Sequence, residues 1–300
     1  MAWEIEFIQW LQKSGGKFLD TLMFLITQIG GELFFIGVAA IIFWCINKKQ
    51  GYKFINIFIL GLIAVNGIKS VVKRPRPYTL QSINPIKETT SGYSFPSGHS
   101  HNAASMSTQL TLMTKSKEKK VFLWSVIIGS ILTVLVMFSR VYLGQHYPSD
   151  VIVGCVLGIT IAIIGSYLFD LLGDKEEVIA YVVAPLCIII SLVCLLTLKE
   201  KAEEIVKVCG AYSALTIGYF VEKRHIKYKI SQPSFIKIAC KILIGILVLL
   251  IIKEGLKFLF TAIMDENSIS FLIFNEFVRY FLIGIWTIIC CPLIFKKLKI

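Results

Sequence analysis

The chain has 300 residues, with 31 Lys and Arg against 19 Asp and Glu, which gives a formal net charge of +12. Hydrophobic residues make up 56% of it and charged residues only 17%, whereas a soluble domain is about 25% charged. This composition excludes a disordered protein and is typical of an integral membrane protein. The basic residues fall between apolar runs, so they indicate loop charges that set topology and no nucleic-acid partner.

The first segment, 1–31, is predicted to lie at the membrane surface. A short amphipathic helix is expected there, with two tryptophans on the face that would enter the headgroup layer. The residues assigned to that face are Trp3, Phe7, Trp10 and Leu11. Residues 18–29 are too few to cross the bilayer and end at Gly30-Gly31, where we expect a helix break.

Uncharged apolar runs in the rest of the chain are suited to membrane-spanning helices. Eight runs are convincing, and a ninth, weaker one is interrupted by charged residues. The eight are 33–47, 54–68, 100–114, 121–139, 151–169, 178–198, 208–221 and 280–295, and the ninth is roughly 237–258. The predicted fold is therefore an all-α, polytopic transmembrane helical bundle of eight or nine spans with an N-terminal interfacial helix.

Basic clusters predict which helix ends face the cytoplasm. If the spans alternate in direction, four clusters fall on one side, which the positive-inside rule assigns to the cytoplasm. The clusters are Lys48, Lys49 and Lys53; Lys115, Lys117, Lys119 and Lys120; Lys223, Arg224, Lys227 and Lys229; and Lys296, Lys297 and Lys299. We therefore expect a multi-pass protein of the cytoplasmic membrane with the C-terminus inside and segments 69–99 and 139–150 outside.

These two outer segments contain most of the unusual polar residues. Lys69, Arg76 and Arg140 are cations on the side that the positive-inside rule disfavours, which makes them candidates for a functional role. They can neutralise a phosphoryl group and the charge that develops on it during transfer. Ser97-Gly98 at a helix start offers backbone N–H groups to the same anion. The segments therefore predict a phosphate-binding site.

Histidines in the same segments can supply the chemistry. Asp150, four positions after His146, can accept a hydrogen bond from one imidazole nitrogen and leave the other free to attack phosphorus. His99, at another helix start, can protonate the leaving oxygen. This set describes transfer through a phosphohistidine and requires neither a metal nor a cofactor. His101 either tunes His99 or caps the helix.

Each of these residues also has a structural explanation on its own. Ser97 and His99 can cap a helix, His146 can anchor a loop, and Arg140 can extend toward the interface. Their convergence on one membrane face favours a site. The eight cysteines all lie in apolar segments and are expected to be packed hydrophobic residues.

Three stretches resemble the signature of the type 2 phosphatidic acid phosphatases, which are integral membrane lipid phosphate phosphatases. They are KSVVKRPRP from Lys69 to Pro77, similar to K-x6-R-P; YSFPSGH from Tyr93 to His99, containing P-S-G-H; and SRVYLGQHYPSD from Ser139 to Asp150, similar to S-R-x5-H-x3-D. The resemblance implies a helical bundle that needs no metal. By motif position it implies phosphate binding by Lys69, Arg76, Ser97 and Arg140, with His146 as nucleophile, Asp150 as its partner and His99 as general acid.

The resemblance covers about residues 32–170. It divides the chain into the interfacial segment 1–31, a phosphatase core of about five helices at 32–171, and additional spans at 172–300. The layout differs from that of a typical six-span bacterial member. It is more similar to the branch that resembles sphingosine-phosphate phosphatases, which carries C-terminal spans. Those spans could shape a groove for lipid, form a homodimer surface or act separately.

The predicted function is hydrolysis of a lipid phosphate monoester or diphosphate at the outer membrane face. Candidate substrates are polyprenyl (undecaprenyl) diphosphate, phosphatidylglycerophosphate, phosphatidic acid and long-chain-base phosphates, and the expected partners are this lipid and the bilayer. A phosphotransferase with the same site and a headgroup transporter are alternatives, and a transporter requires a polar path at midplane. For a diphosphate, Lys73, Arg74 and Lys87 are expected to meet the second phosphate.

Overall fold

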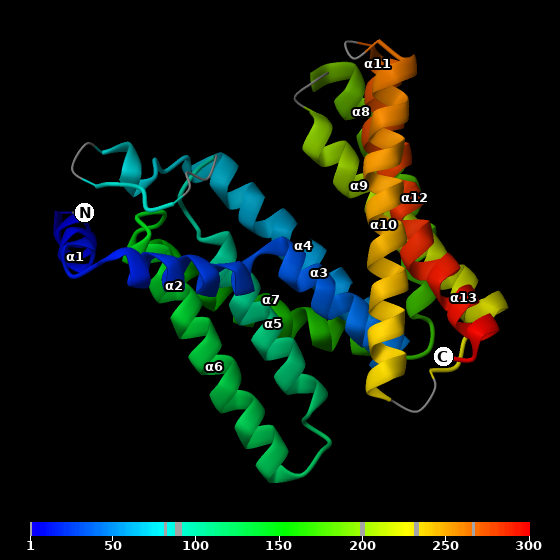
Figure 1. The fold of residues 1–300 in the computed structure, drawn as a ribbon, viewed down its shortest axis with the longest axis horizontal. Coiled ribbons are helices and arrows are strands. Elements are labelled where there is room, and N and C mark those ends of the chain that lie inside the picture. The colour runs from blue at the N-terminus through cyan, green and yellow to red at the C-terminus, as the bar shows by residue number, and fades with distance from the viewer. Residues whose placement is uncertain (1, 81–82, 88–91, 199–201, 231–233, 266–267) are drawn as a thin grey trace. The chain divides into compact units, whose positions relative to one another are not determined.

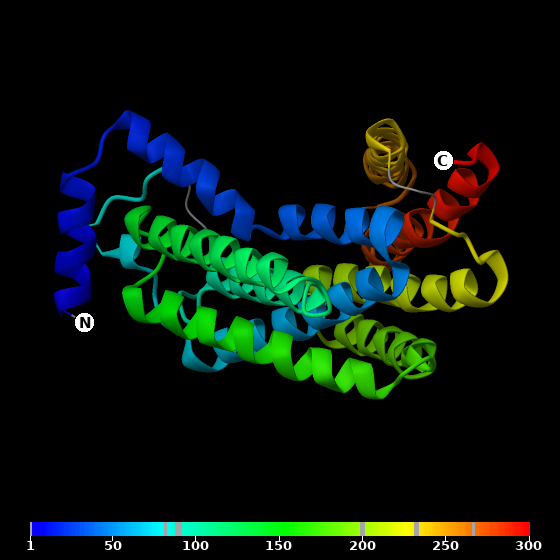
Figure 2. The same cartoon turned by 90° about the horizontal axis from the view of Figure 1, so that it is seen from below.

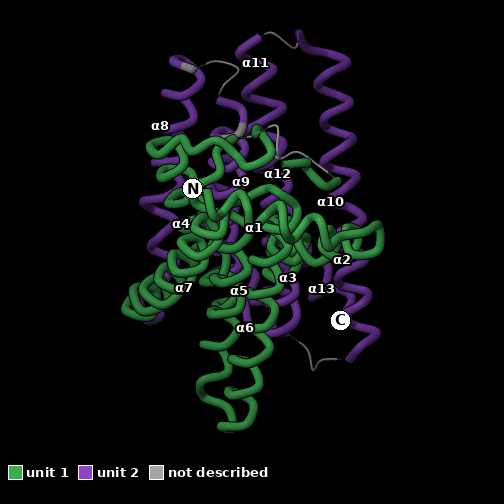
Figure 3. The backbone as a smooth tube through the Cα atoms, turned by 90° about the vertical axis from the view of Figure 1, so that its left-hand side faces the viewer, with its two compact units in different colours: residues 1–39, 49–171 green, residues 40–48, 172–300 purple. Residues whose placement is uncertain are grey.

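The computed structural model describes residues 2–80, 83–87, 92–198, 202–230, 234–265 and 268–300. They form two compact units, coloured separately in Figure 3: residues 1–39 with 49–171, and residues 40–48 with 172–300. The described residues form helices, turns and loops and contain no strand, so the predicted all-α class is confirmed.

Unit 1 contains the three predicted motifs and is built from the first seven α-helices (Figure 1). They are α1 (Ala2–Lys13), α2 (Lys17–Thr27), α3 (Glu32–Ile41), α4 (Lys48–Val72), α5 (Gly98–Met113), α6 (Lys119–Tyr142) and α7 (Pro148–Leu171). The end of α3 and the first residue of α4 belong to unit 2.

Unit 2 contains the remaining α-helices, several of which continue into π-helical turns. They are α8 (Ile179–Leu198), α9 (Glu203–Val221), α10 (Phe235–Ile263), α11 (Ile269–Leu272), α12 (Arg279–Ile285) and α13 (Cys291–Leu298). The π-helical turns are Ile42–Ile46, Glu222–Ile226, Ile273–Val278 and Trp286–Cys290. All eight cysteines are free thiols, and four of them are buried.

Among the described residues, seven helices are long and apolar enough to cross a membrane. A bent pair, Lys17–Gly30 with Glu32–Ile46, makes an eighth if its two arms, 52° apart, form one broken span. The predicted break at Gly30-Gly31 is thus confirmed. The weak ninth run is the 29-residue helix α10.

Helix α5, which is predicted as a span, is not among these seven helices. It has 16 residues and is about 24 Å long, which is shorter than the roughly 30 Å apolar layer of a bilayer. It packs along α6 and α7 (Figure 2). Its polar side chains Ser100, His101, Asn102, Ser105 and Gln109 are buried, so this polar helix is shielded inside the bundle.

Close backbone contact between α5 and α7 depends on a small residue. A Cβ atom at Gly154 would lie 2.4 Å from the carbonyl oxygen of Ser97, so any larger residue would push the helices apart. The contact places the start of α5 against the start of α7. The N–H of Ser97 donates to the carbonyl oxygen of Asp150 at 3.0 Å, and this joins two of the three motifs.

Helix α1 crosses the ends of the unit 1 helices beside the motif loops (Figure 2). Trp3, Phe7 and Trp10 are exposed, as predicted for one amphipathic face. Leu11, predicted on that face, is instead buried in an apolar cluster with Ile8 and residues of α6, α7 and the loops. The helical rotation explains the difference, because the position after Trp10 turns toward the core.

Candidate active site

Arg76 and His146 are the best-defined pair of the site. Arg76 follows α4 in an extended conformation (φ −79°, ψ 152°), and its side chain is 2% exposed. Its Nε donates to the carbonyl oxygen of Gly92 at 3.0 Å and its Nη1 to that of Gln145 at 3.1 Å. Nη1 also lies 3.2 Å from Nε2 of His146. Two carbonyl contacts therefore fix a guanidinium beside one imidazole nitrogen.

The turn between α6 and α7 orients His146. It passes through Gly144 at φ +69°, which a side chain would strain, and Pro148 opens α7. Nδ1 of His146 lies 3.6 Å from Oδ2 of Asp150. This separation is longer than the hydrogen bond that the sequence predicts. Nδ1 thus faces the carboxylate and Nε2 faces Arg76.

Asp150 is fully buried, and several hydrogen-bond donors hold its carboxylate in place. Oδ2 accepts a hydrogen bond from the backbone N–H of Tyr147 at 2.9 Å and a short one from the hydroxyl of Ser94. The Ser94 hydroxyl also lies 3.5 Å from Nδ1 of His146. Ser94 was not predicted from the sequence, because a serine three positions before Ser97 carries no distinguishing pattern.

The start of α5 differs in detail from the prediction. Ser97 is the N-cap, and its hydroxyl accepts from the N–H of Ser100 at 3.4 Å and from the Ser100 hydroxyl at 3.0 Å. Gly98 and His99 form the first turn, where backbone N–H groups have no acceptor within the helix. The feature available to an anion is therefore this first turn more than the Ser97 hydroxyl. His101 is buried against Gly61 and bonds Asn102 at 3.1 Å, so it does not cap the helix.

Positive charge surrounds His146. The pKa of this buried imidazole lies well below its usual 6.5, because burial penalises the cation and because Arg140, Arg76 and Lys69 repel it. Arg140 ends α6, is 4% exposed, and donates to the Thr27 hydroxyl at 3.2 Å. Lys69, in the last turn of α4, is half-buried. The three predicted cations thus act electrostatically on one neutral imidazole.

The sequence predicts that Lys73, Arg74 and Lys87 meet a second phosphate, and this expectation does not fit Arg74. The guanidinium of Arg74 is already engaged by Glu4 and Asp150, at 2.8 Å and 2.6 Å. Lys73 and Lys87 are exposed. The sequence does not predict the contact between Glu4 and Arg74, because Glu4 lies in the expected interfacial helix and 70 positions before Arg74.

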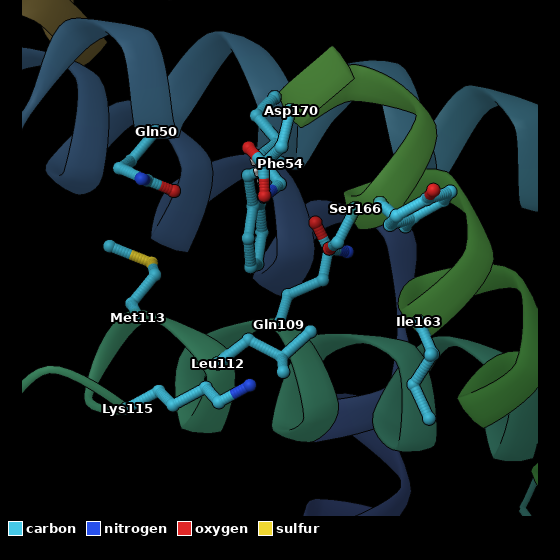
Figure 4. A pocket seen from close by; sticks show the side chains of 11 residues that line it. Gln50, Phe54, Gln109, Leu112, Met113, Lys115, Ile163, Ser166 and Asp170 are labelled. Carbon is cyan, nitrogen blue, oxygen red and sulfur yellow. Dashed lines mark hydrogen bonds and ion pairs between the residues drawn. The ribbon is translucent and has the colours of Figure 1, made fainter.

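A cavity of about 360 Å³ lies away from the motif residues, at the other ends of α4, α5 and α7 (Figure 4). Its wall includes Lys53, whose Nζ bonds both carboxylate oxygens of Asp170 at 2.9 Å and 2.8 Å. Gln109 and Ser166 also line it. In the described part of the chain, no three or more His, Cys, Asp and Glu side chains are grouped so that they could hold a metal ion.

Two family profiles match the chain: "PAP2 superfamily" over residues 50–174, and "PAP2 superfamily phosphatase, transmembrane extension" over residues 206–300. The mouse (Mus musculus) sphingosine-1-phosphate phosphatase 1 is 27% identical over 252 residues, which cover 77% of this chain and 58% of that protein. Undecaprenyl-diphosphatase of Sulfolobus acidocaldarius is 33% identical over 144 residues, 47% of this chain and 66% of that protein. The chain thus spans little more than half the length of the mouse relative.

The fold has a solved counterpart. The crystal structure of the first transmembrane PAP2-type phosphatidylglycerolphosphate phosphatase from Bacillus subtilis matches with a TM-score of 0.50 and 25% identity, over 56% of this chain and 85% of that one. The matched profile at 50–174 contains all three motifs around His146, and the second profile accounts for most of the additional spans. The resemblance seen in the motifs is confirmed, and this multi-span membrane chain belongs to the PAP2 superfamily.

Proposed function

We propose that this chain is a membrane lipid phosphatase that hydrolyses a lipid phosphate monoester or diphosphate through a phosphohistidine. The observation that carries the proposal is the two-sided environment of His146. Nε2 lies 3.2 Å from the Arg76 guanidinium, a phosphate-binding group, while Nδ1 faces the Asp150 carboxylate. An imidazole held in this way is neutral, oriented and close to where a phosphoryl group would bind.

In the first half-reaction, Nε2 of His146 attacks phosphorus. The P–N bond forms as the bond to the leaving oxygen breaks, and His99 donates a proton to that oxygen. Asp150 stabilises the positive charge that the imidazole gains, through Nδ1–H. Arg76, with Lys69, Arg140 and the first turn of α5, stabilises the negative charge on the phosphoryl oxygens.

In the second half-reaction, water replaces the lipid. His99, now neutral, removes a proton from the water as its oxygen attacks phosphorus, and the P–N bond breaks. Inorganic phosphate leaves and His146 returns to the neutral form. An acceptor other than water would make the same site a phosphotransferase.

The placement of the site on the outer membrane face is part of the proposal. Positive charge supports it, because four basic clusters fall on the opposite side of the predicted topology. The lipid headgroup would then reach the start of α5 from the outer leaflet. Relatives named for sphingosine-1-phosphate and for undecaprenyl diphosphate support a lipid substrate and leave its identity open.

The test is phosphate release by the detergent-purified chain in the presence of EDTA. The lipid panel contains a long-chain-base phosphate, phosphatidic acid, phosphatidylglycerophosphate and undecaprenyl diphosphate, with His146→Ala as control. We expect release by the wild type and none by the variant. Equal release by both would overturn the role of His146. Loss of the lipid phosphate without free phosphate would identify a phosphotransferase.

A further inference from the structure

Glu4 is a buried acid far in sequence from the three motifs. It lies on the inward face of α1 and is 4% exposed. One carboxylate oxygen, Oε1, accepts from the backbone N–H of Ser149 at 3.0 Å and from its hydroxyl at 2.6 Å. The other, Oε2, accepts from Nη2 of Arg74 at 2.8 Å. A carboxylate is rarely buried without such partners.

The ionised form of Glu4 is stabilised. Burial alone would raise its pKa, but the hydrogen bonds from Ser149 and the charge of Arg74 outweigh burial and hold the pKa below 4.5. The side chain is therefore a fixed negative charge at neutral pH, placed directly before the first turn of α7.

Arg74 connects this charge to Asp150. Its Nη1 donates to Oδ1 of Asp150 at 2.6 Å and to the Ser149 hydroxyl at 2.7 Å. The guanidinium also stacks over the Tyr147 ring, 3.9 Å from its centroid. One planar cation thus bridges the carboxylates of Glu4 and Asp150 and is held in place from a third direction.

We propose that Glu4 is a positioning residue that acts on His146 through Arg74 and Asp150. This inference rests on the proposed function. By fixing Arg74 on Oδ1, Glu4 leaves Oδ2 of Asp150 facing Nδ1 of His146. By sharing the guanidinium charge, it also preserves the negative charge that Asp150 offers to the imidazolium. The N-terminal helix is thereby a part of the catalytic arrangement.

Glu4→Gln tests the proposal, because it removes the charge and keeps an amide oxygen that can accept from Ser149. Glu6→Gln is the matched control, since Glu6 is an exposed acid on the same helix. We expect kcat of Glu4→Gln to fall roughly 10- to 100-fold with KM little changed, and Glu6→Gln to match the wild type. Glu4→Asp, which keeps the charge, should recover part of the loss.

A double substitution distinguishes a positioning role of Glu4 from a purely structural one. If Glu4 acts through Asp150, the substitution should cause no further fall in kcat when Asp150 is already Asn. A full additional loss in that background would overturn the proposal. So would a kcat of Glu4→Gln equal to that of Glu6→Gln, or a lower thermal midpoint with unchanged kcat for the folded enzyme.

A readout independent of turnover separates this inference from the proposed function. In protein labelled with ¹⁵N-histidine, we expect His146 to be the neutral Nδ1–H tautomer in the wild type and in Glu6→Gln, and a mixture of tautomers in Glu4→Gln. An unchanged His146 signal in Glu4→Gln would refute the positioning role even if no lipid phosphate were hydrolysed. Absence of phosphate release by the wild type would refute the proposed function alone.

Discussion

Replacement of Arg76 by Lys tests whether the guanidinium is a geometric device or only a positive charge. The fork of Arg76 is used on two sides: Nε and Nη1 donate to the carbonyl oxygens of Gly92 and Gln145, and the group lies beside Nε2 of His146. A lysine has one nitrogen and cannot make both carbonyl contacts while it binds a phosphoryl oxygen.

The expected loss can be worked out from these contacts. One donor to the transition-state phosphoryl group is displaced, and removal of one such donor costs about 3 to 4 kcal/mol, or roughly 10²- to 10³-fold in kcat. Two buried carbonyl groups also lose a charged donor, so we expect a lower thermal midpoint. The effect on KM should be smaller than that on kcat, because the contact strengthens as charge develops.

The assay is steady-state phosphate release from a lipid phosphate in detergent micelles with EDTA present. The matched control is Arg224→Lys, because the Arg224 side chain is 60% exposed and pairs with Glu177 at 2.6 Å; this variant should retain wild-type kcat. A folded Arg76→Lys variant with kcat close to that of the wild type would refute the geometric role of the guanidinium.

Three further predictions concern pH, stability and topology. Because the pKa of His146 is lowered, the acidic limb of kcat/KM should lie below pH 6.5, and an acidic limb above pH 6.5 would contradict the effect of burial. The unfolded chain binds that proton more readily than the folded chain, so the stability of the fold should also fall as the pH drops below 6.5. Gly144→Ala should lower the thermal midpoint by the equivalent of about 1 to 2 kcal/mol, whereas Gly16→Ala, where a Cβ meets no atom within 4 Å, should not; equal midpoints would refute the strain. In intact cells, a membrane-impermeant maleimide should label Asn84→Cys and not Lys117→Cys, and the reverse pattern would invert the proposed topology.

The order and spacing of the motifs predict a large part of the site. Arg76, His146 and Asp150 each lie at the end of an apolar run, so alternation of spans alone places them on one membrane face. The structure brings these three residues into contact. For these three residues, the apolar runs and the alternation of spans across the bilayer are enough to predict that they lie on one membrane face.

Contacts between distant segments could not be predicted in the same way. Glu4 reads as the polar side of an amphipathic helix, and only the packing of Ile8 and Leu11 against the core turns it toward Arg74. The contact between α5 and α7 is a similar case. The predicted run 100–114 follows the helix Gly98–Met113 within two residues, but the close approach of Gly154 to Ser97 joins segments that are far apart in the sequence.

Identification of the covalent intermediate is the most direct test of the proposed mechanism. The wild-type enzyme is mixed with a ³²P-labelled lipid phosphate, quenched in alkali within one turnover to preserve phosphohistidine, and digested for mass spectrometry. We expect a phosphoryl group on the peptide that contains His146, formed and lost at rates that support turnover. Label on another residue, or phosphate release at full rate without any phosphoenzyme, would contradict the phosphohistidine mechanism.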